Sequence, residues 1–513
     1  MNDKKRAARG ERTIMAVGKS AQDETWSGKA AFVLAAIGSA VGIGNLVRFP
    51  YVAGDSGGGA FVLIYLLAVF AIGLPVLMAE LFIGRRGGGT PIAAIQRLAK
   101  ADGASGSWTL MGWIGMFASF GIVTFYSVIA GWLLYYAYVM VGDIAGNIGA
   151  NGIAGIASPA FAGEDADGIT GRFGALLSSP GKMILFHGIF ITISTFIVTR
   201  GVKGGIEKAA TWLMPIFFFL LVALSVISLI IGDAGAALGF LFAPDFGKLA
   251  ADIKDGSVLI NAVGQAFFSL SLGSALMLTY GIYLGRDTSI PNAATTVAFA
   301  DTGVALIAGL AVFPVVFAFG LEPAGGLGLI FGPLLLAFNQ MPFGALFGLA
   351  FFIMAVFAAL TSAISLFEVP AAWAKGDNTL DEATRGRRRV IGSVIIGILI
   401  FVIGVFHALS QVPTDAADTF FNSWEPFGSL PVIGERTLLD AIDGLTGNVL
   451  LPLGGFLVAV FAGYVVTQSA SREELGFKSV SNYQRWRFLI RYVCPVVVGA
   501  ILVYGIGIAP FLG

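Results

Sequence analysis

Long apolar stretches alternate with short polar ones along almost the whole chain. Eleven of these stretches are long enough to cross about 30 Å of hydrocarbon as helices. They fall near 30–53, 58–84, 107–141, 183–199, 207–231, 257–284, 293–320, 344–374, 390–408, 444–467 and 488–509. The pattern predicts an all-α, polytopic membrane protein with eleven transmembrane helices embedded in a lipid bilayer.

Composition agrees with this pattern and excludes several functions. Of the 513 residues, 57% are hydrophobic and 12% are charged, against roughly 25% charged in soluble domains. The formal net charge is zero, so we expect no nucleic-acid partner, which would need a basic surface. One cysteine (Cys494) and two distant histidines (His187, His407) leave no disulfide framework and no cysteine/histidine zinc site. We expect no resident cofactor.

The positive charges predict the orientation in the membrane. With the N-terminus placed inside, the inner segments carry 25 Lys and Arg and the outer ones carry 4. Positive residues concentrate on the cytoplasmic side, so the sequence predicts a cytoplasmic N-terminus and an extracellular or periplasmic C-terminus. The polar tail 1–29 lacks the short apolar stretch and small-residue cleavage site that a cleaved signal peptide would show.

The first stretch contains residues that a continuous membrane helix avoids. Gly38, Gly42 and Gly44 lie within seven positions and are followed by Asn45 and Arg48. Glycines alone are commonly explained by close packing of another helix. The adjoining Asn45 and Arg48 instead favour an interruption beside protein or a hydrated cavity.

The sixth stretch has a matching defect at 267–274, with Ser269 and Ser271. Serine hydroxyls can simply bond to their own helix. The two defects, however, occur in the first members of two successive blocks of five stretches, 30–231 and 257–467, with 484–513 forming the eleventh helix and its end. Breaks at corresponding positions of two halves predict a five-plus-five inverted repeat, with broken helices 1 and 6 around a central substrate site.

Other polar groups occur in the remaining stretches. Thr361 and Ser362 either bond to their own helix or complete a neutral oxygen cage for a hard cation. Asp301 is a candidate functional carboxylate, because an unpaired charge at membrane depth is costly. Glu80 and Glu368 lie near the ends of their stretches, where accepting backbone N–H groups freed by the breaks is as plausible as a transport role.

These residues resemble the neurotransmitter:sodium symporters, in their bacterial amino-acid-transporting branch. The resemblance runs from Trp26 to the eleventh stretch, and its most specific pieces are Gly38–Pro50, Asp55–Phe61, Gly264–Gly273, and Gly205 ahead of Pro215. It implies sodium-coupled import of an L-amino acid by alternating access, across the plasma (inner) membrane, and not an enzyme.

The resemblance also implies ligands for two co-transported sodium ions. For one ion they are Ala40, Asn45, Ser269 and Asp301 together with the substrate carboxylate. For the other they are Gly38, Val41, Ala358, Thr361 and Ser362.

Substrate and gate residues follow from the same resemblance. The carboxylate would meet Ile43, Gly44 and Tyr126, and the ammonium would meet carbonyls around Ala40, Phe268 and Ser269. The remaining expected pocket residues are Ile122, Ser271, Ser274, Ser362 and Leu366. Tyr126 with Phe268 would form an aromatic lid, and Arg48 with Asp443 an outer charged gate.

The chain departs from the family pattern at several positions. Asp23 replaces a common arginine and Gly376 replaces an acidic residue, so the usual inner salt bridge is not predicted. Ser274 replaces an often bulky residue, which favours a large hydrophobic or aromatic substrate. Asp301 replaces a neutral asparagine of chloride-dependent relatives, which favours chloride-independent transport. A channel and an amino-acid sensor of the same architecture are the alternatives.

A further expectation concerns the start of the fifth stretch. Gly205 and Pro215 both weaken helix continuity there. The segment is therefore expected either to unwind and admit water during release, or to form a static kink.

Overall fold

The computed structural model describes residues 24–244, 246–247, 257–321, 328–416, 420–428 and 436–505. Within these ranges every regular element is a helix, and nine helices are long and apolar enough to cross a membrane. A tenth crossing is a pair bent by 48°, Lys29–Ala40 with Gly44–Asp55. The predicted all-α polytopic fold is confirmed. Asp23, most of the 1–29 tail and the last residues of the 484–513 segment lie outside the described residues.

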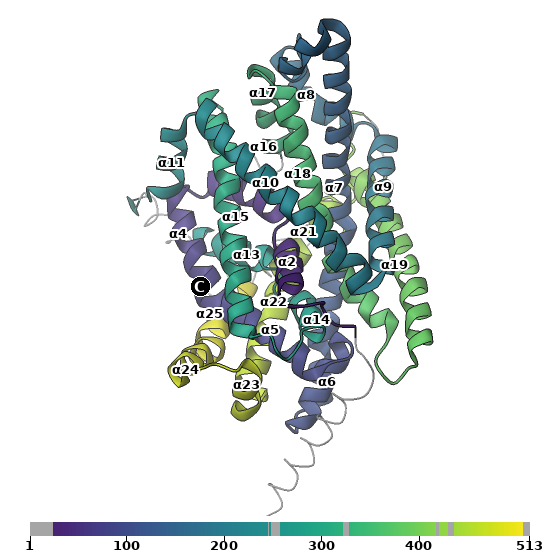
Figure 1. Ribbon diagram of the computed structural model, residues 1–513, viewed down its shortest axis with the longest axis vertical. Helices are drawn as coiled ribbons and strands as arrows, with labels where there is room; N and C mark the ends of the chain where they lie inside the picture. Colours follow the sequence, from purple (N-terminus) through teal and green to yellow (C-terminus); the bar gives the residue numbers. More distant parts are fainter. Residues whose placement is uncertain are drawn as a thin grey trace, which may run out of the picture.

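The first part of the described chain, up to residue 244, begins with the bent pair (Figure 1). Its helices are α2 (Lys29–Ala40), η1 (Gly44–Arg48), α3 (Phe49–Asp55), α4 (Gly59–Ala68), η2 (Val69–Gly73), α5 (Leu74–Gly87), α6 (Pro91–Ala101), η3 (Gly106–Trp108), α7 (Thr109–Asn151), η4 (Gly152–Ala157), α8 (Ala166–Leu177), α9 (Pro180–Thr199), η5 (Val202–Glu207), α10 (Lys208–Ile231) and α11 (Ala234–Phe242).

The second block follows the same alternation of long helices and short connectors. Its helices are α13 (Ser257–Ser269), α14 (Leu276–Ile282), α15 (Ile290–Ala318), α16 (Gly328–Phe331), α17 (Pro333–Gln340), α18 (Gly344–Lys375), α19 (Glu382–Ser410), α20 (Phe420–Ser423), α21 (Leu438–Leu445), η6 (Thr446–Leu450), α22 (Leu451–Val460) and η7 (Phe461–Val465). The chain continues through α23 (Gln468–Leu475), α24 (Val480–Phe488), η8 (Leu489–Val493) and α25 (Cys494–Gly505).

The two blocks contact each other reciprocally. Helices α4 and α5 pack on α13 and α14, while their counterpart α15 packs on α2, η1 and α3. Helices α7 and α18 pack along each other, and α9 and α19 lie beside them (Figure 1). The arrangement fits the expected inverted repeat and places both broken helices in the interior, while the block boundaries stay predictions.

Close packing of α5 against α14 depends on glycine. Gly84 faces the Leu278 carbonyl and Gly281 faces the Leu81 carbonyl so closely that a Cβ on either residue would overlap backbone atoms. The second half of the sixth helix is therefore fixed against α5, as small residues allow between membrane helices.

The region around Gly205 packs more tightly than the sequence suggested. Gly205 belongs to the wide turn η5, and a Cβ there would overlap the Ile197 carbonyl oxygen at the end of α9. Pro215 lies inside the continuous helix α10. The absence of a side chain at Gly205 is thus a packing requirement, whatever its role in unwinding.

We expect Gly205→Ala to lower the free energy of unfolding by about 1–3 kcal/mol, because the backbone must shift to accommodate the new methyl group. Gly204→Ala is the matched control, since the nearest atom to a Cβ there is Arg200 Cβ at 3.9 Å. Thermal unfolding of the purified proteins measures both effects. Equal stability of the two variants would contradict this account of the packing.

Candidate functional site

The first interruption lies between α2 and η1. Val41 after α2 has an extended backbone, with φ −78° and ψ 101°, so neighbouring backbone groups lose their helical partners. Asn45 Oδ1 accepts a hydrogen bond from Gly42 N at 3.2 Å. The Tyr126 hydroxyl from α7 accepts one from Ile43 N at 3.1 Å. Side chains therefore satisfy the broken backbone, as its depth in the membrane requires.

The second interruption lies between α13 and α14. Ser271, Gly273 and Ala275 have left-handed φ values of 53°, 78° and 56°. The Gly273 N–H donates to Glu80 Oε1 of α5 at 2.7 Å. The Ser274 carbonyl accepts from Ser119 at 2.6 Å. Glu80 thus accepts a backbone N–H freed by the break, one of the two roles expected for it.

Asp301 joins the two broken helices. It lies in α15 with no exposed surface. Ser269 Oγ lies 2.8 and 2.7 Å from its two carboxylate oxygens, and Asn45 Nδ2 donates to Oδ1 at 2.8 Å. Tyr65 of α4 donates to Oδ2 at 3.4 Å. A buried carboxylate and a hydroxyl therefore meet the Asn45 amide, whose Nδ2 donates to both. The carboxylate and hydroxyl oxygens suit a hard cation.

A second oxygen cluster joins α2 to α18. Ser362 Oγ lies 3.4 Å from the Gly38 carbonyl oxygen and 3.2 Å from that of Val41. Thr361 Oγ1 lies 3.0 Å from the Ala358 carbonyl oxygen. All five groups are neutral oxygens, which suit a monovalent cation better than a divalent one that needs carboxylates. Ser362 therefore bonds across to α2, whereas Thr361 bonds to carbonyls of its own helix, Phe357 and Ala358.

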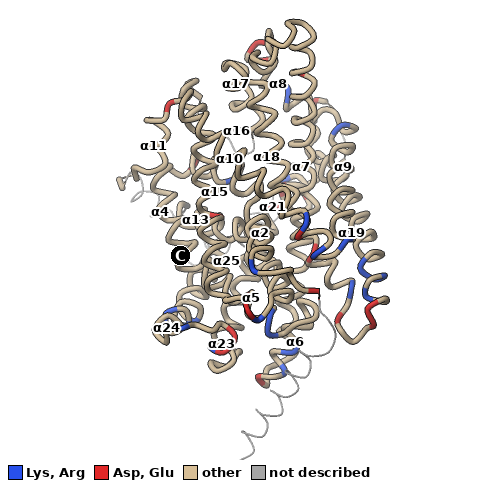
Figure 2. Tube along the Cα trace, viewed as in Figure 1, with Lys and Arg blue, Asp and Glu red and all other residues tan. Residues whose placement is uncertain are grey.

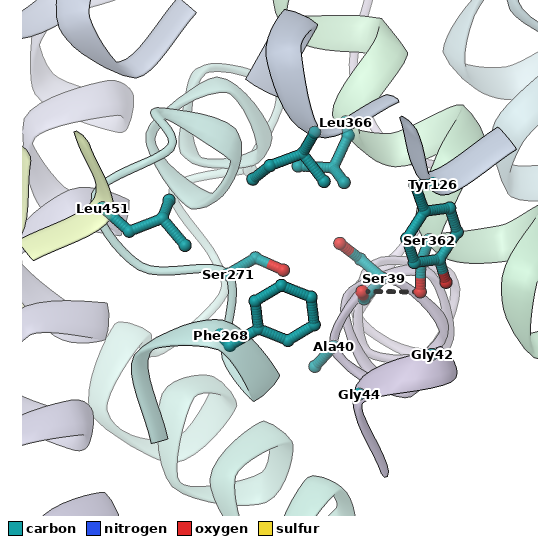
Figure 3. Close-up of a pocket in the computed structure, with 11 residues that line it drawn as sticks. Ser39, Ala40, Gly42, Gly44, Tyr126, Phe268, Ser271, Ser362, Leu366 and Leu451 are labelled. Carbon is teal, nitrogen blue, oxygen red and sulfur yellow. Dashed lines mark hydrogen bonds between the residues drawn. The ribbon is translucent and has the colours of Figure 1, made fainter. Parts of the chain in front are cut away.

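A small cavity lies between the two interruptions, and residues of α7, α18 and α22 complete its walls (Figure 3). Its lining residues are Ser39, Ala40, Gly42, Gly44, Ile122, Tyr126, Phe268, Ser271, Ser362, Leu366 and Leu451. The walls that these described residues form combine apolar side chains with hydroxyls and contain no acidic or basic side chain. Such a cavity can bind a small molecule that supplies its own charges.

Most of the expected substrate residues line this cavity, and three do not. Ile43 turns its N–H to Tyr126, and Ser269 belongs to the Asp301 cluster. Ser274 is buried and donates to the Ser271 carbonyl at 2.6 Å, so its small size does not itself enlarge the cavity.

Three lining residues, Ser39, Gly42 and Leu451, were not among the expected substrate residues. Ser39 stands between Gly38 and Ala40, which were expected as ion ligands. Its sequence signal was a polar residue within an apolar stretch, and Gly42 belongs to the glycines of the first interruption. Leu451, at the start of α22, has no distinguishing sequence signal because the eleven stretches are rich in leucine.

The expected outer gate has a different set of contacts. The Arg48 guanidinium carbon lies 4.8 Å from the centre of the Phe268 ring, and Nη1 lies 3.4 Å from Gln265 Oε1. Gln265 in turn donates to the Gly44 carbonyl at 2.9 Å. Among the described residues, Arg48 and Asp443 are not within ion-pair distance. Arg48 therefore contacts Gln265 and Tyr51 directly, and not Asp443.

The segment before α2 packs against the second half of the other broken helix. Trp26 donates through Nε1 to the Tyr280 carbonyl at 3.3 Å and through its backbone N–H to that of Tyr283 at 3.2 Å. The indole also packs edge-on against both tyrosine rings. The segment is thereby attached to α14.

Charged groups attach the same segment to α18 and α19. Glu24 Oε2 lies 2.9 Å from Lys375 Nζ and 3.3 Å from Arg389 Nη1. Arg389 also pairs with Glu368 at 2.5 Å, and Glu368 accepts from Tyr283 at 2.8 Å. Relatives form an inner salt bridge between an arginine and an acidic residue, and here Glu24 pairs with Lys375 and Arg389 instead. Glu368 pairs with Arg389 and, within the described part of the chain, does not accept a backbone N–H group from a helix break.

The environment of Glu24 keeps it ionised. Burial alone would raise the pKa of its carboxyl, but the charges of Arg389 and Lys375, with hydrogen bonds from Lys375 and the Val202 N–H, outweigh it and lower the pKa. A lowered carboxyl pKa means that stabilisation is present above the ordinary glutamate pKa and is lost as pH falls through the lowered value. The contact therefore persists throughout the neutral range.

Comparison with known proteins identifies close relatives. The sequence matches the model of the Sodium:neurotransmitter symporter family over residues 23–144 and 172–424. It is 34% identical over 489 residues to the uncharacterized sodium-dependent transporter YhdH of Bacillus subtilis, covering 95% of this chain and 98% of that one. It is 27% identical over 377 residues to the sodium- and chloride-dependent GABA transporter ine of Drosophila melanogaster, covering 68% of this chain and 39% of that one. The crystal structure of MhsT in complex with L-phenylalanine aligns with a TM-score of 0.79 and 35% identity, covering 94% of this chain and 100% of that one.

We expect Glu24→Gln to loosen the segment before α2. Loss of a partly buried, charge-assisted contact worth about 1.5 kcal/mol corresponds to roughly tenfold faster hydrogen exchange at the Trp26 amide. Glu382→Gln, in the exposed first turn of α19, is the control and should leave exchange unchanged. Unaltered exchange in Glu24→Gln would show that Trp26 alone holds the segment.

Proposed function

The chain belongs to the sodium:neurotransmitter symporter family, and from this premise we propose that it imports an L-amino acid together with two sodium ions. It is a multi-pass membrane transporter rather than an enzyme. The observation that carries the proposal is the meeting of the Asn45, Ser269 and Asp301 cluster with an uncharged cavity between two broken helices.

The two oxygen clusters are the proposed sodium sites. In the first, the Ala40 carbonyl, Asn45, Ser269 and Asp301 surround one ion, and the substrate carboxylate completes its shell. Binding of the sodium ion then raises the affinity for the substrate, and binding of the substrate raises the affinity for the ion by the same factor, because the ion contacts the substrate carboxylate directly. The second ion is held by the neutral oxygens of α2 and α18, among them Ser362 and Thr361.

The cavity favours a substrate that carries its own carboxylate. Gly42 and Gly44 expose backbone, and a Cβ at Gly42 would lie 2.5 Å from Ser362 Oγ and 2.8 Å from the Tyr126 hydroxyl oxygen. Among the described residues, no acidic side chain lines the cavity to pair with an amine lacking a carboxylate. The Gly44 N–H, the Ile43 N–H and the Tyr126 hydroxyl are therefore the proposed carboxylate partners.

The apolar wall favours a large hydrophobic or aromatic side chain. Ile122, Phe268, Leu366 and Leu451 supply it. The aligned MhsT structure contains L-phenylalanine, which supports the same class of substrate here.

The charge distribution supports a cytoplasmic N-terminus. Figure 2 shows Lys and Arg gathered around α6, α23, α24 and the nearby end of α19. Positive residues mark the cytoplasmic side of a membrane protein. On this assignment Glu24 closes the inner side of the site and Arg48 lies on the outer side, facing the periplasm or medium.

Uptake by the purified protein in liposomes tests the function. We expect accumulation of labelled leucine or phenylalanine against its gradient when sodium is high outside, and none when potassium replaces sodium. Leucine, phenylalanine, tyrosine and tryptophan should compete for uptake roughly tenfold or more better than glycine and alanine, because each buried methylene contributes about 0.8 kcal/mol. Sodium-independent flux would indicate a channel, and binding without flux a sensor. Alanine displacing the label better than leucine would contradict the proposed substrate class.

A further prediction concerns the dependence of transport on chloride. Asp301 supplies a fixed negative charge beside the proposed sodium site, so wild-type transport should be unaffected when gluconate replaces chloride. We expect Asp301→Asn to abolish transport or make it dependent on added chloride. Asp233→Asn, at the N-terminus of α11, is the control and should behave as wild type. An Asp301→Asn protein that transports normally without chloride would place the charge balance elsewhere.

A further inference from the structure

The Ser39 side chain is buried without a hydrogen-bond partner. It lies in the last turn of α2 with 1% of its surface exposed. Its Oγ contacts no donor or acceptor among the described residues. Four other buried helical serines, Ser127, Ser194, Ser225 and Ser365, donate to the carbonyl four residues earlier. Ser39 forgoes this local bond although an unsatisfied buried hydroxyl is costly.

The Ser39 hydroxyl points into the cavity. Figure 3 shows its oxygen directed into the open space between Leu366 and Phe268, away from Ser362. The Ser39 carbonyl oxygen, in contrast, accepts from Ser362 Oγ at 3.1 Å. The backbone of this residue therefore belongs to the second oxygen cluster, while its side chain faces the apolar wall. Ser271 faces the same space from the other broken helix.

Among the residues that the structure describes, the two other buried serine hydroxyls without a partner do not share this position. Ser228 on α10 and Ser393 on α19 are also buried without a partner, but neither lines the cavity. The hydroxyls of Tyr126 and Ser362, which do line it, already bond to backbone groups of the first broken helix. Ser39 thus offers a free donor and acceptor where the substrate side chain is expected.

We propose that Ser39 is a specificity-determining residue that hydrogen-bonds a polar atom on the side chain of the transported amino acid. The inference rests on the proposed function, in which Gly44 and Tyr126 fix the substrate carboxylate and the side chain extends toward Ile122 and Leu366. The preferred substrates are then large amino acids with a side-chain hydroxyl or N–H group, such as tyrosine and tryptophan, rather than their apolar counterparts.

Paired ligands test the proposal. Sodium-dependent binding to the purified protein is measured by competition for tyrosine against phenylalanine, and for tryptophan against 3-benzothienylalanine, which replaces the indole N–H by sulfur. In Ser39→Ala, the affinity ratio of the polar to the apolar member should fall about tenfold for at least one pair, as expected for one lost hydrogen bond. The affinity for the apolar member should change by less than twofold. Ser393→Ala removes a buried, unpartnered hydroxyl outside the cavity and should leave both ratios unchanged.

The outcomes separate this proposal from the function on which it rests. Unchanged ratios in Ser39→Ala, or equal loss of affinity for both members of each pair, would overturn the role of Ser39 while leaving amino-acid transport intact. Failure of the wild-type protein to bind any amino acid in sodium would overturn the proposed function itself.

Discussion

The need to satisfy backbone polar groups inside a membrane is the constraint on which this structure depends. Two helices can be interrupted only because groups from elsewhere replace their lost hydrogen bonds. Tyr126 accepts from Ile43 at the first break, and Glu80 accepts from Gly273 at the second. The site therefore needs α5 and α7 as much as the broken helices themselves. The groups left over after this replacement, mainly carbonyl oxygens and hydroxyls, form the proposed ion sites.

Much of this arrangement could be predicted from the sequence because the relevant signals are local. Glycines next to Asn45 and Arg48 in an apolar stretch predicted the first break, and the position of the 267–274 defect predicted the second. Asp301 stood out because carboxylates are rare at membrane depth. The structure brings it to Asn45 and Ser269, as the family resemblance implied.

The remaining features depend on contacts between residues far apart in the chain. Glu24 meets Lys375 and Arg389 only because the folded chain brings three segments together, and no local pattern marks such a partner. Leu451 is one leucine among many until α22 is placed beside the cavity. The length of α7, which continues to Asn151, also exceeds its apolar stretch, since a helix can extend beyond the hydrocarbon without a change in its backbone.

The double attachment of the segment before α2 makes its two contacts respond differently to ionic strength. Trp26 is attached to α14 by hydrogen bonds and ring packing, whereas Glu24, 24% exposed, is attached to α18 and α19 by charge. Raising salt from 0.1 M to 1 M shortens the screening length from about 10 Å to about 3 Å, which weakens the charged contact, while excluded salts such as sulfate strengthen apolar burial. A rising salt concentration therefore weakens the attachment of this segment to α18 and α19 more than its attachment to α14.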